Sequence, residues 1–202
     1  MSLPAEDSMI AEEDRLRADL YDFLAALLAR PADAELLATC AALQGDDTPL
    51  GRAIAALAAE ARVTNPADVE REYNALFIGV GRGELLPYAS YYLTGFLNEK
   101  PLASLRSDMG TYRIERAENV FEPEDNVASL MEMMAGIITG RFAVPESLER
   151  QKQFFGKHVG PWAKHFFTDL EAAKNGLFYA HVGAIGKTFM EIEADGFRLA
   201  SD

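Results

Sequence analysis

The sequence predicts an all-α fold, a single globular helical domain of about eight to ten helices. Apolar residues recur three and four positions apart along almost the whole chain, which is the period of an α-helix. No segment alternates apolar and polar residues as a half-buried strand does, and no hairpin dipeptide joins two such segments. Prolines and cap residues divide the chain into lengths typical of globular helices. We therefore expect helices packed ridges into grooves.

The first two expected helices are separated by Pro31. The first ends before this proline, because the residue preceding a proline avoids helical backbone angles. Its apolar face comprises Leu16, Leu20, Phe23, Leu24, Leu27 and Leu28. Asp33 is expected to cap the second helix by accepting a hydrogen bond from a free N–H group. The apolar face of this second helix comprises Leu36, Leu37, Cys40 and Leu43.

The third and fourth expected helices each open with a cap residue followed by proline. Thr48-Pro49 and Asn65-Pro66 have this form, which suits an N-cap and the first helical turn. The third helix points Ile54, Leu57 and Ala61 inward. The fourth ends at Gly79, and its apolar face comprises Val69, Tyr73, Leu76 and Phe77.

The middle of the chain is predicted to be less regular. Residues 79–92 contain three glycines and a proline, which is typical of an irregular loop. Pro101 then starts a helix whose apolar face comprises Leu102, Leu105, Met109 and Tyr112. Residues 115–121 are polar and lack a helical period, so we interpret them as a hinge.

The segment Glu122-Pro123-Glu124-Asp125-Asn126 is the most acidic in the chain. An apolar face follows it at helical spacing and ends at about Gly140: Val127, Leu130, Met131, Met134, Ile137 and Ile138. We expect the acidic segment at the start of this helix, with Pro123 in the first turn and the carboxylates facing the positive end of the dipole. Two interpretations remain open here, a well-capped helix start or a carboxylate site that holds a basic ligand.

Three further helices complete the prediction. Pro145 opens one, with Leu148, Gln151, Phe154 and Phe155 on its apolar face, and Pro161 opens another, with Trp162, Phe166 and Leu170. The last and longest has an apolar face of Phe178, Val182, Ile185, Phe189 and Ile192.

Composition limits the possible partners and the expected location. The net charge of −13, from 19 basic and 32 acidic residues, argues against nucleic acid and favours cationic partners. Cys40 is the only cysteine, so no internal disulfide forms and a reducing cytoplasm is expected. The first fifteen residues are acidic without an apolar run, unlike a secretory signal. No apolar stretch is long enough for a membrane span.

The sequence shows no catalytic set and no cofactor or metal motif. A di-iron bundle needs Glu three residues before His, but aromatic residues occupy that position before His158, His165 and His181. One cysteine and three scattered histidines do not suit zinc, so each histidine is expected to be a partly buried structural residue. The glycines of residues 79–83 follow a helix and lack a Lys-Ser/Thr pair, so they predict a helix end and not a phosphate-binding loop.

Several segments together resemble the TorD/DmsD family of cytoplasmic chaperones for molybdenum redox enzymes. Tyr73-x-x-Leu76-Phe77 is similar to the family's aromatic-x-x-Leu-Phe motif, and the loop from Pro87 to Ser90 follows it. Residues 122–126 are similar to its Glu-Pro-x-Asp-His hinge motif. The likeness continues through Phe154-x3-His158-x3-Trp162 and Phe178-Tyr179-Ala180, and it spans residues from about 15 to 195.

One position departs from this pattern. Asn126 stands where the family usually has histidine. Asparagine keeps a hydrogen-bonding side chain but does not become cationic near neutral pH. A family role that needs a titrating imidazole is therefore not expected here, whereas hydrogen bonding or helix capping is.

The resemblance implies a chaperone and not an enzyme. Such a protein binds the twin-arginine signal peptide, the body, or both, of a molybdenum-containing oxidoreductase precursor during cofactor insertion, before export. Asp125 is the leading expected contact with the peptide, because carboxylates accept guanidinium groups in bidentate fashion. The apolar residues of the implied site can line a groove for the apolar stretch of the peptide. The implied signal-peptide site comprises Tyr73, Leu76, Phe77, Pro87, Tyr88, Ser90, Glu122, Glu124, Asp125 and Asn126.

The same resemblance implies one TorD-like domain over residues 1–202. We expect an N-terminal subdomain at about 8–115, a hinge at 116–126 and a C-terminal subdomain at about 127–200, as a monomer or a domain-swapped dimer. Two alternatives remain open. One is a generic acidic helical scaffold for protein interactions, and the other is a small helical enzyme with a spatially assembled site.

Overall fold

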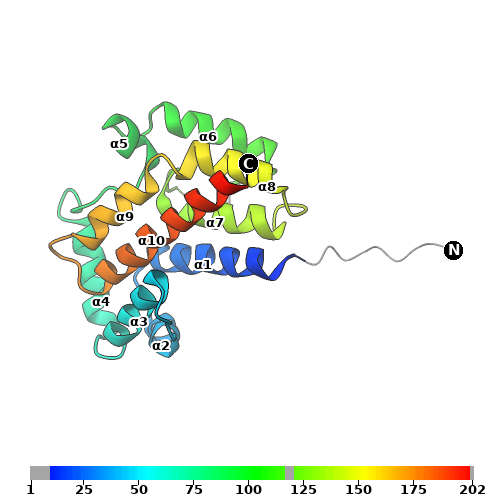
Figure 1. The fold of residues 1–202 in the computed structure, drawn as a ribbon. Coiled ribbons are helices and arrows are strands. Elements are labelled where there is room, and N and C mark those ends of the chain that lie inside the picture. The colour runs from blue at the N-terminus through cyan, green and yellow to red at the C-terminus, as the bar shows by residue number, and fades with distance from the viewer. Residues whose placement is uncertain (1–9, 117–120, 201–202) are drawn as a thin grey trace.

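The computed structural model describes residues 10–116 and 121–200, and these residues form an all-helical fold (Figure 1). No β-strand occurs in the described ranges, where one isolated bridge joins Tyr88 to Asn126. The all-α prediction is confirmed. The helices are α1 (Glu12–Ala29), α2 (Ala34–Ala42), α3 (Pro49–Ala61), α4 (Pro66–Tyr73), α5 (Ala89–Thr94), α6 (Lys100–Thr111), α7 (Val127–Thr139), α8 (Leu148–Phe154), α9 (Ala163–Glu171) and α10 (Phe178–Leu199), with π-helical turns η1 (Asn74–Ile78) and η2 (Phe155–Val159).

Helix α7 forms the centre of the molecule. It is buried on nearly every side, which is typical of a helix that is apolar all round. Helix α1 lies beside α7, while α10 packs against α9 and α3 (Figure 1). The buried apolar residues form one cluster that includes members of α1, α4, α7 and α10. The predicted subdomains therefore share a core, and their division stays a prediction because residues 117–120 of the hinge lie outside the described residues.

Helices α2, α3 and α4 start where the sequence predicts them, each with its predicted capping side chain. Asp33 accepts a hydrogen bond from the Leu36 backbone N–H at 2.9 Å, and Thr48 accepts one from Gly51 at 3.0 Å. Asn65 accepts one from Asp68 at 3.1 Å. Each cap satisfies a backbone donor that the first turn leaves free, so a short segment of sequence is sufficient to place it.

The predicted start of α7 is wrong by four residues. Pro123 does not occupy its first turn, because the helix begins at Val127 and Asn126 is its N-cap. The Asn126 side chain accepts a hydrogen bond from the Ala128 N–H at 2.9 Å. The Val127 N–H donates to the Pro87 carbonyl at 2.8 Å, so a distant loop holds this segment outside the helix. The acidic residues therefore precede α7 and do not form its first turn.

Two other boundaries and the burial of three side chains also differ from the prediction. Part of the expected loop at 79–92 is helical, since α5 begins at Ala89. Helix α8 starts at Leu148, capped by Ser147, three residues later than the expected start at Pro145. Leu16, Leu148 and Ile192 were expected on apolar faces, but they are exposed.

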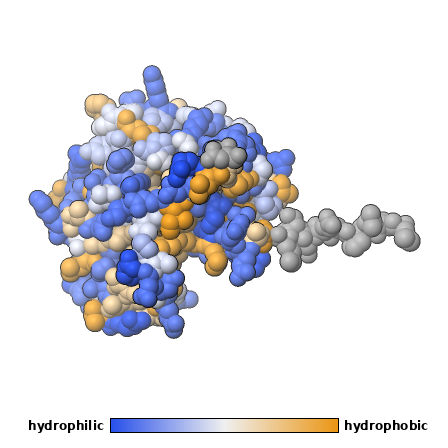
Figure 2. Space-filling view, in the orientation of Figure 1, coloured by the Kyte–Doolittle hydropathy of each residue, from blue (hydrophilic) through white to orange (hydrophobic). Residues whose placement is uncertain are grey.

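The face of the molecule drawn in Figure 2 is mainly hydrophilic, with an apolar strip where Figure 1 draws the C-terminal half of α10. None of the helices in the described part of the chain combines the length and apolar character that a membrane crossing requires.

Candidate functional site

The acidic segment is tied to the loop before α5 by three hydrogen bonds. The Ala89 N–H donates to the Asp125 carbonyl at 3.0 Å, and the Val127 N–H donates to the Pro87 carbonyl at 2.8 Å. The Ser90 N–H donates to Asp125 Oδ2 at 2.8 Å, across 35 residues of sequence. The structure thus brings together Pro87, Ser90 and Asp125, which the sequence places in two separate motifs.

The Asp125 carboxylate is buried, and within the described residues one of its two oxygens is hydrogen-bonded. The residue is 1% exposed, and Oδ1 has no hydrogen-bond partner among the described residues. The neighbouring Ser90 hydroxyl, in a residue that is fully buried, also lacks a partner there. A buried polar group without a partner costs about 1–3 kcal/mol, so such atoms call for an explanation. A ligand that donates hydrogen bonds at this place would provide one.

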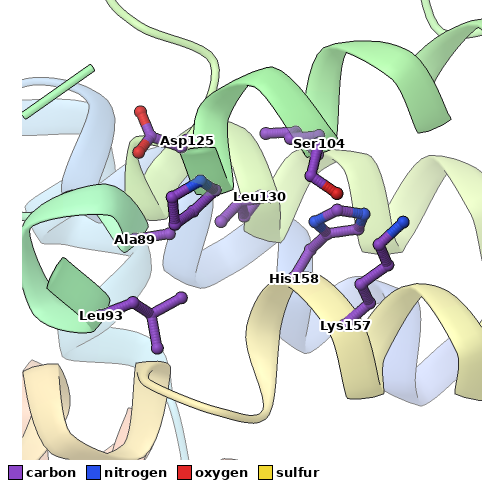
Figure 3. Close-up of a pocket in the computed structure, with 9 residues that line it drawn as sticks. Ala89, Leu93, Ser104, Asp125, Leu130, Lys157 and His158 are labelled. Carbon is purple, nitrogen blue, oxygen red and sulfur yellow. The ribbon is translucent and has the colours of Figure 1, made fainter. Parts of the chain in front are cut away.

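Asp125 lines a pocket between α5, α6 and the start of η2, with a cavity volume of about 150 Å³. A cavity of this size is known to accept a group as large as benzene. Figure 3 shows Asp125 at one end of the pocket and His158 and Lys157 at the other. The remaining lining residues are mainly apolar: Ala89, Leu93, Pro101, Ser104, Leu105 and Leu130.

At the end of the pocket opposite Asp125, the basic side chains already pair with a carboxylate of the protein, Asp108. His158 Nε2 lies 2.7 Å from Asp108 Oδ2, and Lys157 Nζ lies 2.6 Å from the same oxygen. Burial lowers the pKa of His158 below its usual range, although Asp108 opposes this. Burial of Asp108 acts against its charge, but its hydrogen bonds to Lys157 and His158 lower the pKa of its carboxyl overall.

The prediction of partly buried structural histidines agrees with His181, which is half-buried. His158 is more deeply buried, at 5% exposed, and its carbonyl accepts a hydrogen bond from Trp162 Nε1 at 2.8 Å. The prediction is wrong for His165, which is exposed. Among the described residues, no group of three or more His, Cys, Asp and Glu side chains is placed to hold a metal ion.

The three carboxylates of the acidic segment have different partners. Glu124 is 8% exposed and pairs with Arg106 at 2.8 Å and with Arg116 at 3.4 Å. Burial opposes its charge, but the hydrogen bond from Arg106 lowers the pKa of the Glu124 carboxyl below its ordinary value. Glu124 is thus already neutralised within the protein.

Glu122 lies on the surface. Its carboxylate accepts hydrogen bonds from the Tyr88 hydroxyl and, at 3.5 Å, from Asn126 Nδ2. Burial and the bond to Glu122 raise the pKa of Tyr88. These two side-chain partners of the Glu122 carboxylate are uncharged, while Arg116 donates a hydrogen bond to the Glu122 backbone carbonyl at 3.3 Å.

The aromatic part of the predicted site belongs to the core in this structure. Leu76 is fully buried, and Tyr73 donates its hydroxyl hydrogen bond to the Leu28 carbonyl at 3.0 Å. The rings of Tyr73 and Phe77 both pack edge-on against Tyr179, with centroids 5.6 and 5.7 Å away. Tyr73, Leu76 and Phe77 do not line the Asp125 pocket, and their contact with a peptide stays a prediction.

The sequence motifs did not identify the contribution of α6 to the pocket. Pro101, Ser104 and Leu105 line the pocket, but they look like ordinary residues of an amphipathic helix. Lys157 and His158 come from a third segment. Of the motifs found in the sequence, the pattern of Phe154, His158 and Trp162 is the one that includes a residue at this end of the pocket, His158.

Comparison with known proteins identifies the relatives of this chain. Residues 43–168 match the family model described as nitrate reductase delta subunit. The chain is 29% identical over 171 residues to the chaperone protein TorD of Vibrio cholerae, covering 74% of this chain and 77% of that protein. It is 23% identical over 199 residues to the chaperone protein TorD of Vibrio parahaemolyticus, covering 88% and 93%.

A solved structure shares the fold. It is a crystal structure described as that of a redox enzyme maturation protein from Archaeoglobus fulgidus, with a TM-score of 0.57 and 20% identity. The match covers 87% of this chain and 94% of the other.

Proposed function

The chain belongs to the TorD family of redox-enzyme maturation chaperones, and from this premise we propose that it binds the twin-arginine signal peptide of a molybdenum-containing oxidoreductase precursor. Binding takes place in the cytoplasm during cofactor insertion and delays export until the enzyme is complete. The body of the precursor is a second contact of the same chaperone. The protein acts by holding its partner and not by catalysis, in agreement with relatives that are named chaperones.

The observation that carries this proposal is the unpaired Oδ1 of Asp125. A guanidinium group offers five N–H donors in a planar fork and remains charged at every physiological pH. One arginine head in the pocket can therefore donate to Asp125 Oδ1, which lacks a partner in the described structure. Charge-assisted bonds of this kind are about twice as strong as neutral ones.

The size of the pocket limits what enters it. A cavity of about 150 Å³ accepts one guanidinium group with part of its alkyl chain, not two. The second basic residue of the pair then lies outside, where exposed Glu122 offers a carboxylate held by Tyr88 and Asn126. Glu124 keeps its own arginine partners and acts as a positioning residue for the segment.

The remaining predicted residues act in different ways. The Pro87 carbonyl and the Ser90 N–H hold the acidic segment in place. Tyr73, Leu76 and Phe77 support the site from the core, through their packing against α1 and α10. The net charge of −13 attracts a basic peptide over distance, so association should slow as ionic strength rises.

Calorimetric titration of a twin-arginine signal peptide into wild type and Asp125→Ala tests the proposal. We expect the variant to bind at least about tenfold more weakly, which corresponds to about 1.4 kcal/mol. Asp19→Ala is the matched control, because it removes one exposed carboxylate from α1 and leaves the pocket intact. Equal affinities of all three proteins would remove Asp125 from the site. Failure of the wild type to bind any candidate signal peptide would refute the signal-binding function itself.

A further inference from the structure

Exposed apolar side chains surround the end of α5, next to the Asp125 pocket. Phe96 is 69% exposed, and Leu93 and Leu97 are each 42% exposed. Leu93 also lines the pocket, one helical turn after Ala89, which lines it too. The apolar surface and the pocket are therefore continuous. We call Leu93, Phe96 and Leu97 the α5 shelf. Apolar surface is visible in Figure 2 at the end of the molecule where Figure 1 draws α5.

The turn that carries the α5 shelf is held by local hydrogen bonds. The Gly95 N–H donates to the Tyr91 carbonyl at 2.8 Å, with Gly95 at φ +82°. The Thr94 hydroxyl donates to the Ser90 carbonyl at 2.7 Å and accepts a bond from the Phe96 N–H at 3.2 Å. Phe96 is thus presented to solvent by an ordered turn that starts at Ser90, the residue that also binds Asp125.

We propose that the α5 shelf docks the apolar stretch that follows the basic pair of the client's signal peptide. The inference rests on the proposed function and adds to it the surface that takes the uncharged part of the peptide. Such a peptide carries a cationic head and then an apolar run. The protein carries, in the same order, a buried carboxylate, a pocket with apolar walls and an exposed apolar surface. This arrangement matches the peptide in both charge and polarity.

The α5 shelf suits a short peptide better than a second copy of the chain. An aromatic side chain contributes roughly 150–250 Å² to a contact, so three apolar side chains offer only a few hundred Å². A stable dimer interface needs about 1,200 Å² or more. A single apolar segment needs no more than the α5 shelf provides, especially when an arginine in the adjoining pocket anchors it.

The inference also changes where the apolar part of the site lies. Among the motif residues, Leu76 is fully buried, and Tyr73, which is half-buried, uses its hydroxyl for a hydrogen bond to the Leu28 carbonyl. The α5 shelf lies on the opposite side of Ser90 in sequence and is open to solvent. The apolar contacts of the peptide are therefore assigned to α5 and its turn, and not to the helix that precedes the glycine loop.

Calorimetric titration of three proteins and a control variant with three peptides tests this assignment. The proteins are wild type, Asp125→Asn, and the double variant Phe96→Ser/Leu97→Ser. The peptides are a twin-arginine signal peptide, the same peptide with both arginines replaced by glutamine, and the same peptide with its apolar run replaced by serine. The matched control is Val63→Ser/Leu177→Ser, which removes two apolar side chains that are 78% and 72% exposed, away from α5.

We expect the double variant to bind the intact peptide about tenfold more weakly than wild type, the loss that partial burial of an aromatic and a leucine side chain predicts. The same variant should match wild type for the peptide that lacks the apolar run. The Val63→Ser/Leu177→Ser control should bind like wild type. Because the exchanged side chains are exposed, all variants should retain the helical circular dichroism of wild type.

The outcomes separate this inference from the proposed function. If Asp125→Asn weakens binding while the double variant does not, the α5 shelf is not the docking surface and the signal-binding function stands. If the wild type binds no signal peptide, both are overturned. If light scattering shows a dimer that the double variant loses, the α5 shelf is an interface between copies, which also overturns the inference.

Discussion

Two buried carboxylates, Glu193 and Asp125, are used in opposite ways by this fold. Glu193 is 3% exposed, and both of its oxygens are paired: Arg17 Nε lies 2.7 Å from Oε1, and the Tyr21 hydroxyl lies 2.9 Å from Oε2. Asp125 is 1% exposed, and within the described residues only one of its oxygens is paired, with the Ser90 N–H. The two carboxylates are thus about equally buried but differ in how many of their oxygens are hydrogen-bonded.

The difference teaches how a structural carboxylate can be told from a binding one. Glu193 joins α1 to α10, and its pairing with Arg17 spans 176 residues of sequence. Burial opposes the charge on Arg17, but the hydrogen bond and attraction from Glu193 raise the pKa of Arg17 above its ordinary value. This pair serves the fold. Asp125 instead keeps one carboxylate oxygen that no group in the described residues pairs and that an arriving cation can engage.

The largest expected effect comes from Glu193→Gln. The substitution keeps the shape but removes one of the two carboxylates that pair with the partly buried Arg17, so that Asp14 at 2.6 Å remains, and breaking a buried pair typically costs about 3–5 kcal/mol. We expect a fall of about 3 kcal/mol in the free energy of unfolding, measured by chemical denaturation. Signal-peptide affinity of the folded fraction should not change. A loss of unfolding free energy smaller than about 1 kcal/mol would contradict the structural role assigned to Glu193.

The matched change at the other carboxylate is Asp125→Asn. It keeps an oxygen that can accept the Ser90 N–H, and it removes an uncompensated buried charge. We expect the free energy of unfolding to stay within about 1 kcal/mol of wild type, or to rise, while peptide affinity falls about a hundredfold, or about 2.7 kcal/mol. Denaturation and calorimetry on the same samples measure both. A large loss of stability would place Asp125 with Glu193, as a structural residue.

A smaller, pH-dependent effect is expected at Glu124. The folded protein lowers the pKa of this carboxyl below its ordinary value of 4.5, so its stabilisation is present above that pH and is lost as pH falls through the lowered pKa. Arg106 is half exposed, so solvent weakens the pair. Glu124→Gln should cost about 1–2 kcal/mol near pH 7. The difference from wild type should shrink toward zero below about pH 4, as denaturation across pH would show. A gap independent of pH would contradict this account.

The smallest effect is expected at Asn126→Ala. The variant loses the N-cap of α7 and the bond to Glu122, and loss of a cap costs typically about 1 kcal/mol. We expect a stability loss of that size and at most a few-fold loss of peptide affinity, because Glu122 keeps its bond to Tyr88. Asn126→Asp should recover the cap but not the hydrogen bond to Glu122, so only part of the stability should return. An affinity loss as large as that of Asp125→Asn would make Asn126 a direct contact.

Local chemistry explains which parts of the fold could be predicted from sequence. Asp33, Thr48 and Asn65 cap helices through bonds to their own neighbours, so a few residues are enough to place those starts. The start of α7 depends instead on the Pro87 carbonyl, 40 residues earlier in the chain. Ile192 follows the apolar period of α10 but is exposed, while the adjacent Glu193 is buried because Arg17 and Tyr21 meet it.

The site was predictable only in part for the same reason. The motif at residues 122–126 indicated Asp125, but not that Ser90 would occupy one oxygen and leave the other unpaired. The motif at Tyr73, Leu76 and Phe77 indicated a groove, but Tyr179 and the Leu28 carbonyl engage these side chains in the core. No pattern in the sequence distinguishes Phe96 as exposed, since its position depends on the turn at Gly95.

The most direct test of the central claim is a cycle that changes both partners of the proposed ion pair. Wild type and Asp125→Asn are each titrated with the twin-arginine peptide and with the peptide whose arginines are replaced by glutamine. We predict a coupling of at least about 1.4 kcal/mol, so that either change alone loses affinity and the second change adds little. Losses that simply add would contradict a contact between Asp125 and the arginine.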